Sequence, residues 1–75
     1  MIASIIGATG YTGGELIRLL LNHDKIEIGT LTSESHVGKK VADFHPNLNG
    51  LVDQNFVSLD VNKIIDESDV LFAAL

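Results

Sequence analysis

Residues 5–16 decide the fold of this 75-residue chain, and they read Ile5-Ile6-Gly7-Ala8-Thr9-Gly10-Tyr11-Thr12-Gly13-Gly14-Glu15-Leu16. The preceding stretch, Ile2–Ile6, is a nearly unbroken apolar run, which is typical of a strand buried on both faces of a parallel sheet. Beyond the glycines, apolar side chains recur at helical spacing, at Leu16, Ile17, Leu20 and Leu21. A glycine-rich turn therefore joins a buried strand to an amphipathic helix.

Three glycines of this turn form a Gly-x-x-Gly-x-x-Gly motif, and each has a separate task. Gly7 lets the backbone leave the strand in a tight turn, and Gly13 lets the helix pack close to the strand. Gly10 removes the Cβ that would keep a pyrophosphate away from the backbone. The N–H groups of the first helical turn then face the phosphates at the positive end of the helix dipole. We predict a dinucleotide phosphate loop, in preference to glycines that only form a turn.

The flanking pattern extends this unit to a strand, a helix and a second strand. Thr12 and Glu15 stand three residues apart, as a capping box requires, so we predict that the helix begins at or just before Thr12. The polar run Asn22–Asp24 ends the helix. The stretch Lys25–Thr32 alternates in a β-rich pattern and is predicted to be the second strand.

The second half of the chain is less regular. From Ser33 to Gln54, turn residues interrupt the strand and helix periodicity. Within this stretch one face of a short helix could be formed by Val37, Val41, Phe44 and Leu48. A short third strand is predicted over Asn55–Leu59. Asp60 is placed to cap a helix whose inward residues are Val61, Ile64 and Ile65. A further buried strand is predicted over Val70–Leu75.

Strands that alternate with helices imply parallel pairing through right-handed crossovers. The predicted fold class is therefore α/β, with a partial doubly wound parallel sheet of the Rossmann type. Because the sequence stops on an apolar strand without a turn or cap, we expect truncation after the fourth predicted strand. Residues 1–75 would form the N-terminal part of a Rossmann-type dinucleotide-binding domain, with no second domain in this chain.

Composition narrows the classes of function. The formal net charge of −5 opposes binding to nucleic acid or to an anionic membrane surface. With 45% hydrophobic residues the chain should fold, yet its apolar runs are far shorter than the ~20 residues that span a bilayer. The absence of cysteine leaves no disulfide and no thiol nucleophile in these residues, and it fits a cytoplasmic protein.

The end of the second predicted strand bears on the choice of cofactor. Hydroxyls at Thr32, Ser33 and Ser35, followed by Lys39 and Lys40, favour NADP, because a 2′-phosphate needs hydrogen-bond donors and positive charge. The two lysines would serve equally well as a solvated edge of the loop. In the opposite direction, Glu34 could accept from the ribose 2′-hydroxyl of NAD if its carboxylate turned inward.

The histidines and the single tyrosine give weaker indications. His23, His36 and His45 lack helical pairing and thiol neighbours, so we predict no metal site and expect ordinary structural positions. His45 precedes Pro46, which favours an extended backbone. Tyr11 could cover the cofactor or simply pack half-buried at the start of the helix.

Four segments together resemble the N-terminal part of the N-acetyl-gamma-glutamyl-phosphate reductase family. They are Ile5–Leu16, Leu31-Thr32-Ser33 with Gly38-Lys39, His45-Pro46-Asn47-Leu48 before Gly50, and Asp69–Leu75. The first segment is shared loosely with aspartate-semialdehyde dehydrogenases, whereas Tyr11-Thr12 and the His45-Pro46 segment are more particular to the family. The chain departs from the family at Glu34 and Asn49, where the family usually carries arginine.

The resemblance implies an NADPH-dependent oxidoreductase of arginine biosynthesis. In such an enzyme a cysteine thiolate attacks the acyl phosphate, a thioester forms, and hydride from NADPH yields the semialdehyde. It implies that the cysteine, its partner histidine and the domain that binds the acyl-phosphate substrate lie beyond residue 75. We therefore predict no catalytic residue in this chain. The predicted cofactor-binding residues are Gly7, Thr9, Gly10, Tyr11, Thr12, Gly13, Thr32, Ser33, Ser35, Ala73 and Ala74.

Two other classes of function share the glycine motif. One is an NADP-dependent epimerase or atypical short-chain reductase, and the other is a nucleotide-sensing module without catalysis. In each case the partner is a small-molecule cofactor. Because a chain of this size leaves a sheet edge and apolar helix faces uncovered, we also expect a homo-oligomer.

Overall fold

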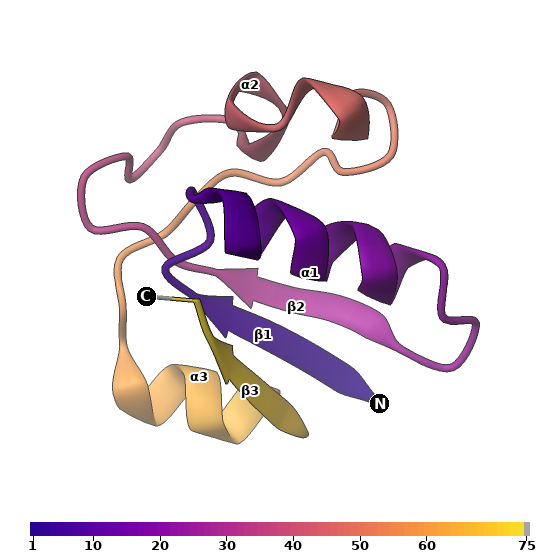
Figure 1. The fold of residues 1–75 in the computed structure, drawn as a ribbon. Helices are drawn as coiled ribbons and strands as arrows, with labels where there is room; N and C mark the ends of the chain where they lie inside the picture. Colours follow the sequence, from indigo (N-terminus) through magenta and orange to yellow (C-terminus); the bar gives the residue numbers. More distant parts are fainter. Residues whose placement is uncertain (75) are drawn as a thin grey trace.

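Three parallel strands and the helices around them make up the computed structural model, which describes residues 1–74 (Figure 1). The elements in chain order are β1 (Ile2–Ile6), α1 (Tyr11–Leu21), β2 (Glu27–Leu31), α2 (Val41–Phe44), the 3-10 helix η1 (Pro46–Leu48), α3 (Val61–Glu67) and β3 (Val70–Ala73). Leu75, the end of the last predicted strand, lies outside the described residues.

The strand order is β2-β1-β3, with β1 in the middle. Both of its neighbours run parallel to it, Ala3 pairing with Ile28 on one side and with Val70 on the other. The carboxyl ends of all three strands therefore meet at one edge of the sheet. The glycine-rich turn leaves the sheet at this edge, from its central strand.

The side chains of β1 alternate between two differently packed faces. Ala3 and Ile5 are fully buried in the same apolar cluster as Ile17 and Leu20 of α1. Ser4 points the other way, where its hydroxyl is hydrogen-bonded to that of Ser68 just after α3. Helices α1 and α3 thus lie on opposite faces of the sheet (Figure 1).

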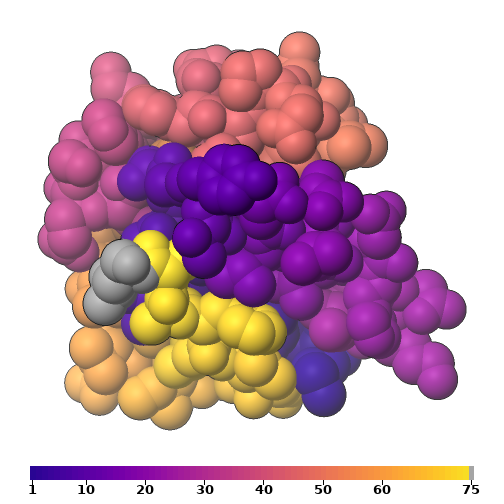
Figure 2. Space-filling view, viewed as in Figure 1, coloured from indigo at the N-terminus to yellow at the C-terminus, as the bar shows by residue number. Residues whose placement is uncertain are grey.

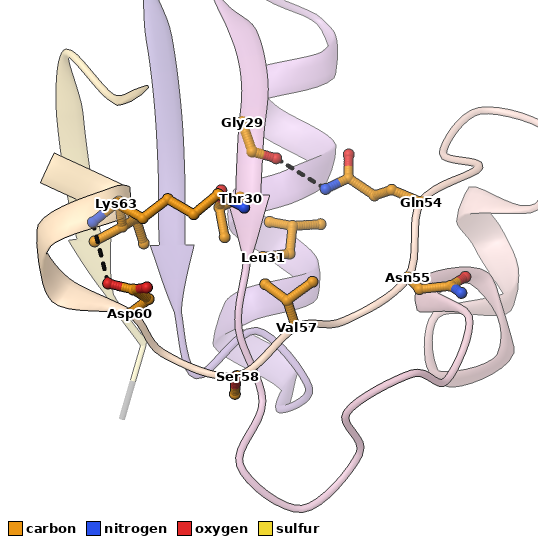
Figure 3. A pocket seen from close by; sticks show the side chains of 10 residues that line it. Gly29, Thr30, Leu31, Gln54, Asn55, Val57, Ser58, Asp60 and Lys63 are labelled. Carbon is orange, nitrogen blue, oxygen red and sulfur yellow. Dashed lines mark hydrogen bonds between the residues drawn. The ribbon is translucent and has the colours of Figure 1, made fainter. Parts of the chain in front are cut away.

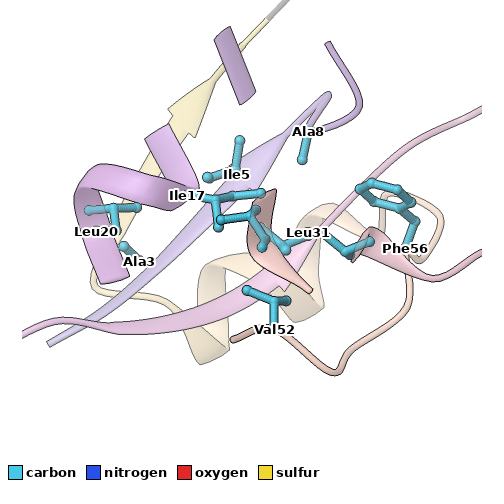
Figure 4. Packing of buried hydrophobic residues seen from close by; sticks show 10 residues of the cluster. Ala3, Ile5, Ala8, Ile17, Leu20, Leu31, Val52 and Phe56 are labelled. Carbon is cyan, nitrogen blue, oxygen red and sulfur yellow. The ribbon is translucent and has the colours of Figure 1, made fainter. Parts of the chain in front are cut away.

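The apolar cluster on the α1 face extends beyond the sheet to the irregular second half of the chain. Val41, Leu48, Val52 and Phe56 are buried together with Ala8 of the glycine-rich turn (Figure 4). The space-filling view shows the segment that contains α2 packed directly against α1 (Figure 2). A segment without long elements therefore packs against one side of the turn, at Ala8, and leaves Gly10 and Tyr11 exposed.

The prediction of a strand over Asn55–Leu59 is wrong. This stretch forms only isolated bridges, a parallel one between Val57 and Thr32 and an antiparallel one between Asn55 and Lys40. One bridge is parallel and the other antiparallel, and Phe56 between them is buried in the core. The stretch therefore does not pair continuously with any one strand, as a β-ladder requires. The α/β class is confirmed with a three-stranded parallel sheet, and the four-stranded doubly wound arrangement is not.

Helices α1 and α3 both differ in detail from their predictions. The expected capping box is wrong, because α1 begins at Tyr11 with Gly10 as its N-cap and no side-chain cap bond. Glu15 binds Arg18 instead, at 2.9 Å. In α3, Asp60 caps Lys63 N–H as predicted, at 3.2 Å. Only Ile64 of its three apolar residues is buried, since this short helix presents one residue per turn to the sheet; Val61 and Ile65 are exposed.

Candidate functional site

The glycine-rich turn is held by hydrogen bonds to Thr32, the residue that follows β2. Gly7 has a φ of +76°, a conformation that L side chains rarely adopt, as its predicted role in a tight turn requires. Its N–H donates to the Thr32 hydroxyl at 3.1 Å, and the N–H of Ala8 donates to the Thr32 carbonyl at 2.9 Å. Thr32 is buried and supports the loop; a direct contact with a cofactor stays a prediction.

Gly13 brings α1 into close contact with the same turn. A Cβ at this position would lie 2.7 Å from backbone atoms of Ala8, which leaves no room for any side chain. Because the obstructing atoms are backbone, the helix could not move away without disturbing the turn. The close approach predicted for Gly13 is therefore confirmed.

Gly10 occupies the opposite kind of environment. It is exposed, and among residues 1–74, its two chain neighbours aside, a Cβ built on it would have no heavy atom within 4 Å. Gly14 N–H makes a helical hydrogen bond to Gly10 O at 3.1 Å. The N–H groups of Tyr11, Thr12 and Gly13 precede that bond, so they have no partner within the helix, as in the first turn of any helix. The open space lies where the loop hypothesis places a pyrophosphate.

The side chains around this opening are accessible. Tyr11 is 84% exposed, which excludes the alternative in which its ring packs half-buried. Thr12 is also exposed, and Thr9 is half-buried. The carboxyl end of β3 reaches the same sheet edge, where Ala74 N–H donates to Ile6 O at 2.9 Å. Ala73 is exposed there, so the structure brings the loop and the end of β3 together.

The residues after β2 differ in burial and in hydrogen bonding. Ser33 is 3% exposed, and its hydroxyl has no hydrogen-bond partner among residues 1–74. A buried hydroxyl of this kind is normally paired, so the missing partner sets Ser33 apart from Thr32. Ser35 is exposed. Glu34 turns toward the start of α3, where its carboxylate accepts from Leu59 N–H at 3.4 Å.

His45 is the residue that sequence reasoning missed. It is 7% exposed, and its Nε2 lies 2.7 Å from the carbonyl oxygen of Ala8. The sequence offers the family resemblance of the His45-Pro46 segment and the backbone restriction by Pro46, but neither reveals a partner 37 positions away. His36 instead stacks on Phe44 with ring centroids 4.3 Å apart, and His23 is exposed.

Charges near the loop are few. The Glu15 carboxylate accepts hydrogen bonds from Arg18 on the outer surface of α1, and this contact raises the pKa of Arg18. Lys39 and Lys40 are exposed. Within residues 1–74 there is no group of three acidic, histidine or cysteine side chains that could hold a metal ion. No helix in the described chain has the length and apolarity needed to cross a membrane.

A separate cavity of about 370 Å³ opens beside β2 on the α3 face (Figure 3). It lies between Thr30 of the strand, Gln54 of the irregular segment and Lys63 of α3. Gln54 closes one side by donating to the carbonyl of Gly29 at 2.8 Å. None of the predicted cofactor-binding residues lines this cavity, so it is distinct from the opening above Gly10.

The amino-acid sequence is similar to those of several known proteins. Residues 2–75 match the family model described as semialdehyde dehydrogenase, NAD binding domain. An N-acetyl-gamma-glutamyl-phosphate reductase from Brachyspira hyodysenteriae is 53% identical over 96% of this chain and 20% of its own length. A reductase of the same name from Methanococcus maripaludis is 49% identical over 95% of this chain and 21% of its own length.

A third relative carries a different name. The [LysW]-L-2-aminoadipate/[LysW]-L-glutamate phosphate reductase of Saccharolobus solfataricus is 47% identical over 96% of this chain and 20% of its own length. The chain thus spans about a fifth of the length of the curated relatives it matches. All three are named as phosphate reductases, and the third differs from the other two in the acyl group that its name specifies.

Proposed function

The chain belongs to the semialdehyde dehydrogenase family, as part of its NAD-binding domain, and from this premise we propose that it is the NADPH-binding segment of an acyl-phosphate reductase. The substrate we propose is N-acetyl-glutamyl 5-phosphate, which the enzyme would convert to the semialdehyde in arginine biosynthesis. Relatives about 50% identical carry the corresponding reductase name. This family favours the reductase over an epimerase or a short-chain reductase.

The single observation that carries the proposal is the open space above Gly10, beside a loop that is firmly packed at Ala8 and Gly13. Gly13 and Thr32 fix the loop against α1 and β2, whereas among residues 1–74, its chain neighbours aside, nothing lies within 4 Å of the position of a Cβ on Gly10. A diphosphate could approach the backbone N–H groups of Tyr11–Gly13 there, without first displacing a side chain. The residues present therefore fit a dinucleotide.

The roles of the individual residues follow from this placement. The first turn of α1 would bind the diphosphate through its N–H groups, and Thr9, Tyr11 and Thr12 would border it. The exposed Ser35 and the two lysines would contact a 2′-phosphate, and the unpartnered hydroxyl of Ser33 would join them if the residues that bury it moved aside. Glu34 does not oppose this, because its carboxylate is turned toward Leu59. When bound, the dinucleotide supplies the hydride that reduces the acyl group.

A second candidate activity has an observation in its favour. The relative from Saccharolobus solfataricus is named for aminoadipate and glutamate phosphates attached to LysW, and it is 47% identical to this chain. The cofactor-binding segment would serve both activities in the same way, since the acyl group is recognised elsewhere. We propose that the enzyme is cytoplasmic in either case and that its small-molecule partners are the cofactor and one of these acyl phosphates.

The test is an assay of the natural protein that contains this chain. NADPH oxidation would be followed with N-acetyl-glutamyl phosphate, and in parallel with aminoadipyl phosphate attached to LysW. Turnover of the first substrate alone is the result we expect. Turnover of the second alone would favour the other activity. Tight NADPH binding without turnover of either would indicate a nucleotide-sensing module instead.

A further inference from the structure

The carbonyl of Ala8 is held by a histidine from a distant part of the chain. Nε2 of His45 lies 2.7 Å from this oxygen, in a buried setting. A carbonyl oxygen can only accept, so Nε2 must carry the proton and donate it. Ala8 is the first residue after Gly7 in the glycine-rich turn. The bond therefore fixes the direction of a peptide group inside the proposed phosphate loop.

The same imidazole ring also contacts the first turns of α1. A Cβ at Gly14 would lie 2.6 Å from Nδ1 of His45 and 2.8 Å from its Cε1. Glycine is disfavoured inside a helix, so its presence at position 14 needs a packing reason. Space for the histidine ring provides that reason. The ring is thus wedged between the turn and the helix whose N–H groups would face the diphosphate.

His45 is itself firmly held. Its N–H donates to Val41 O at 3.1 Å, and its carbonyl accepts from Leu48 N–H at 2.8 Å. Val41 and Leu48 are anchored in the apolar core. Pro46 restricts the backbone of the histidine further. A rigid support for the ring means that its hydrogen bond can orient the Ala8 peptide rather than follow it.

From this geometry we propose that His45 is a positioning residue for dinucleotide binding, and that Gly14 exists to admit its ring. The proposal rests on the proposed function, since it assumes that the loop binds a diphosphate. His45 does not touch the cofactor site itself. It acts through Ala8, by holding the turn in the conformation that directs the N–H groups of Tyr11–Gly13 into the open space.

The first test compares NADPH affinity in His45→Leu, His45→Gln and His23→Gln variants of the natural protein, by fluorescence titration well below the melting temperature. Leucine keeps apolar volume and removes the donor, so we expect the dissociation constant to rise about tenfold. Glutamine can place an amide N–H near the position of Nε2 and should restore most of the affinity. His23 is exposed at the far end of α1 and should be neutral when replaced.

A role in folding alone would give a different pattern. It would lower the melting temperature of His45→Leu and leave the NADPH dissociation constant unchanged, and that result would overturn the proposal. Failure of the unaltered protein to bind NADPH would overturn the proposed function and this inference with it. Binding by the unaltered protein with equal affinity in His45→Leu would overturn this inference alone.

A double-mutant cycle adds a second test, and its Gly14→Ala arm leaves His45 in place if variants of His45 do not fold. Gly14→Ala should weaken NADPH binding about tenfold, because its methyl group displaces the ring. In a His45→Ala background the ring is gone, so adding Gly14→Ala should have little further effect. Equal losses in both backgrounds, or no loss in either, would contradict the contact between ring and helix.

Discussion

Gly10 and Gly13 are three residues apart in one motif, but the space around their Cα atoms differs. Gly13 faces the backbone of Ala8 so closely that no side chain fits. Gly10 faces open space, and its backbone, with φ −77° and ψ 178°, is one that any residue adopts. Packing therefore explains Gly13, whereas Gly10 is explained by its N-cap position or, on the phosphate-loop hypothesis, by the approach of a diphosphate.

Replacing Gly10 with valine should therefore impair binding and spare folding. The side chain would enter the space proposed for the pyrophosphate, so we expect NADPH affinity to fall roughly a hundredfold or more, which is about 3 kcal/mol. The melting temperature should change little, because no neighbour is displaced. Fluorescence titration and thermal unfolding of the same preparation measure both quantities.

Gly13→Val is the matched control for that experiment. Its side chain would meet backbone atoms at 2.7 Å, so it should lower the melting temperature strongly or prevent folding. Unchanged NADPH affinity in Gly10→Val would contradict the phosphate-loop hypothesis, whatever the behaviour of Gly13→Val.

The hydroxyl of Ser33 allows a test of the preference for NADPH over NADH. Its hydroxyl is buried without a partner among residues 1–74, so removing it should not destabilise the fold. If it binds a 2′-phosphate, Ser33→Ala should weaken NADPH about tenfold and leave NADH affinity unchanged. Parallel titrations with the two cofactors give the ratio, and Ser58→Ala, an exposed serine, is the control. An equal effect on both cofactors would argue against a phosphate contact.

At the scale of helices and strands, the sequence correctly predicted those features that depend only on neighbouring residues, such as the ends of an element and its cap. Strand β1 has the predicted bounds, and α1 ends where Asn22–Asp24 interrupts its apolar repeat. Asp60 caps α3 because a carboxylate before a helix binds the first free N–H groups wherever the helix lies. These features need no knowledge of distant residues.

Features that depend on distant partners were not predictable in the same way. The stretch Asn55–Leu59 has strand-like composition, but its neighbours Thr32 and Lys40 run in opposite directions relative to it. The contact of His45 with Ala8 joins residues 37 positions apart. Of the cofactor-binding residues, the glycine motif could be identified because glycine has a specific geometric meaning. The loop support by Thr32 and His45 could not, because it is visible only in the packed molecule.

The cap of α3 gives a prediction at this scale. Asp60→Ala removes the acceptor for Lys63 N–H, which should lower the free energy of unfolding by about 1 kcal/mol. Chemical denaturation followed by circular dichroism measures the change. Asp66→Ala, an exposed carboxylate later in the same helix, should have a much smaller effect. Equal effects of the two variants would mean that the cap does not stabilise α3.

For the whole molecule, the net charge of −5 has the same sign as the proposed anionic ligand and repels it at long range. Exposed charges more than about 10 Å away are largely screened at physiological salt, whereas helix N–H groups act on the phosphates at contact distance. The local field can therefore favour binding despite the overall sign. Within residues 1–74 the acidic side chains near the loop include Glu15, which is engaged with Arg18.

The distribution of apolar surface leads to the last prediction, which concerns self-association. In the described sheet β3 lies at an edge, and its Leu71 is 41% exposed. An uncovered parallel strand can pair with another chain, and apolar side chains on it favour that pairing. The 75-residue chain alone should therefore sediment above its monomer mass of 8.1 kDa.

Leu71→Lys should shift that equilibrium toward the monomer, because a buried ammonium at a strand interface is unfavourable. Leu51→Lys is the control, since Leu51 is even more exposed, at 66%, but lies outside the sheet after η1. Analytical ultracentrifugation over a concentration series distinguishes the two variants. A greater loss of association in Leu51→Lys than in Leu71→Lys would place the contact on the α2 segment instead, and a monomer in every case would show that the edge of β3 does not pair in solution.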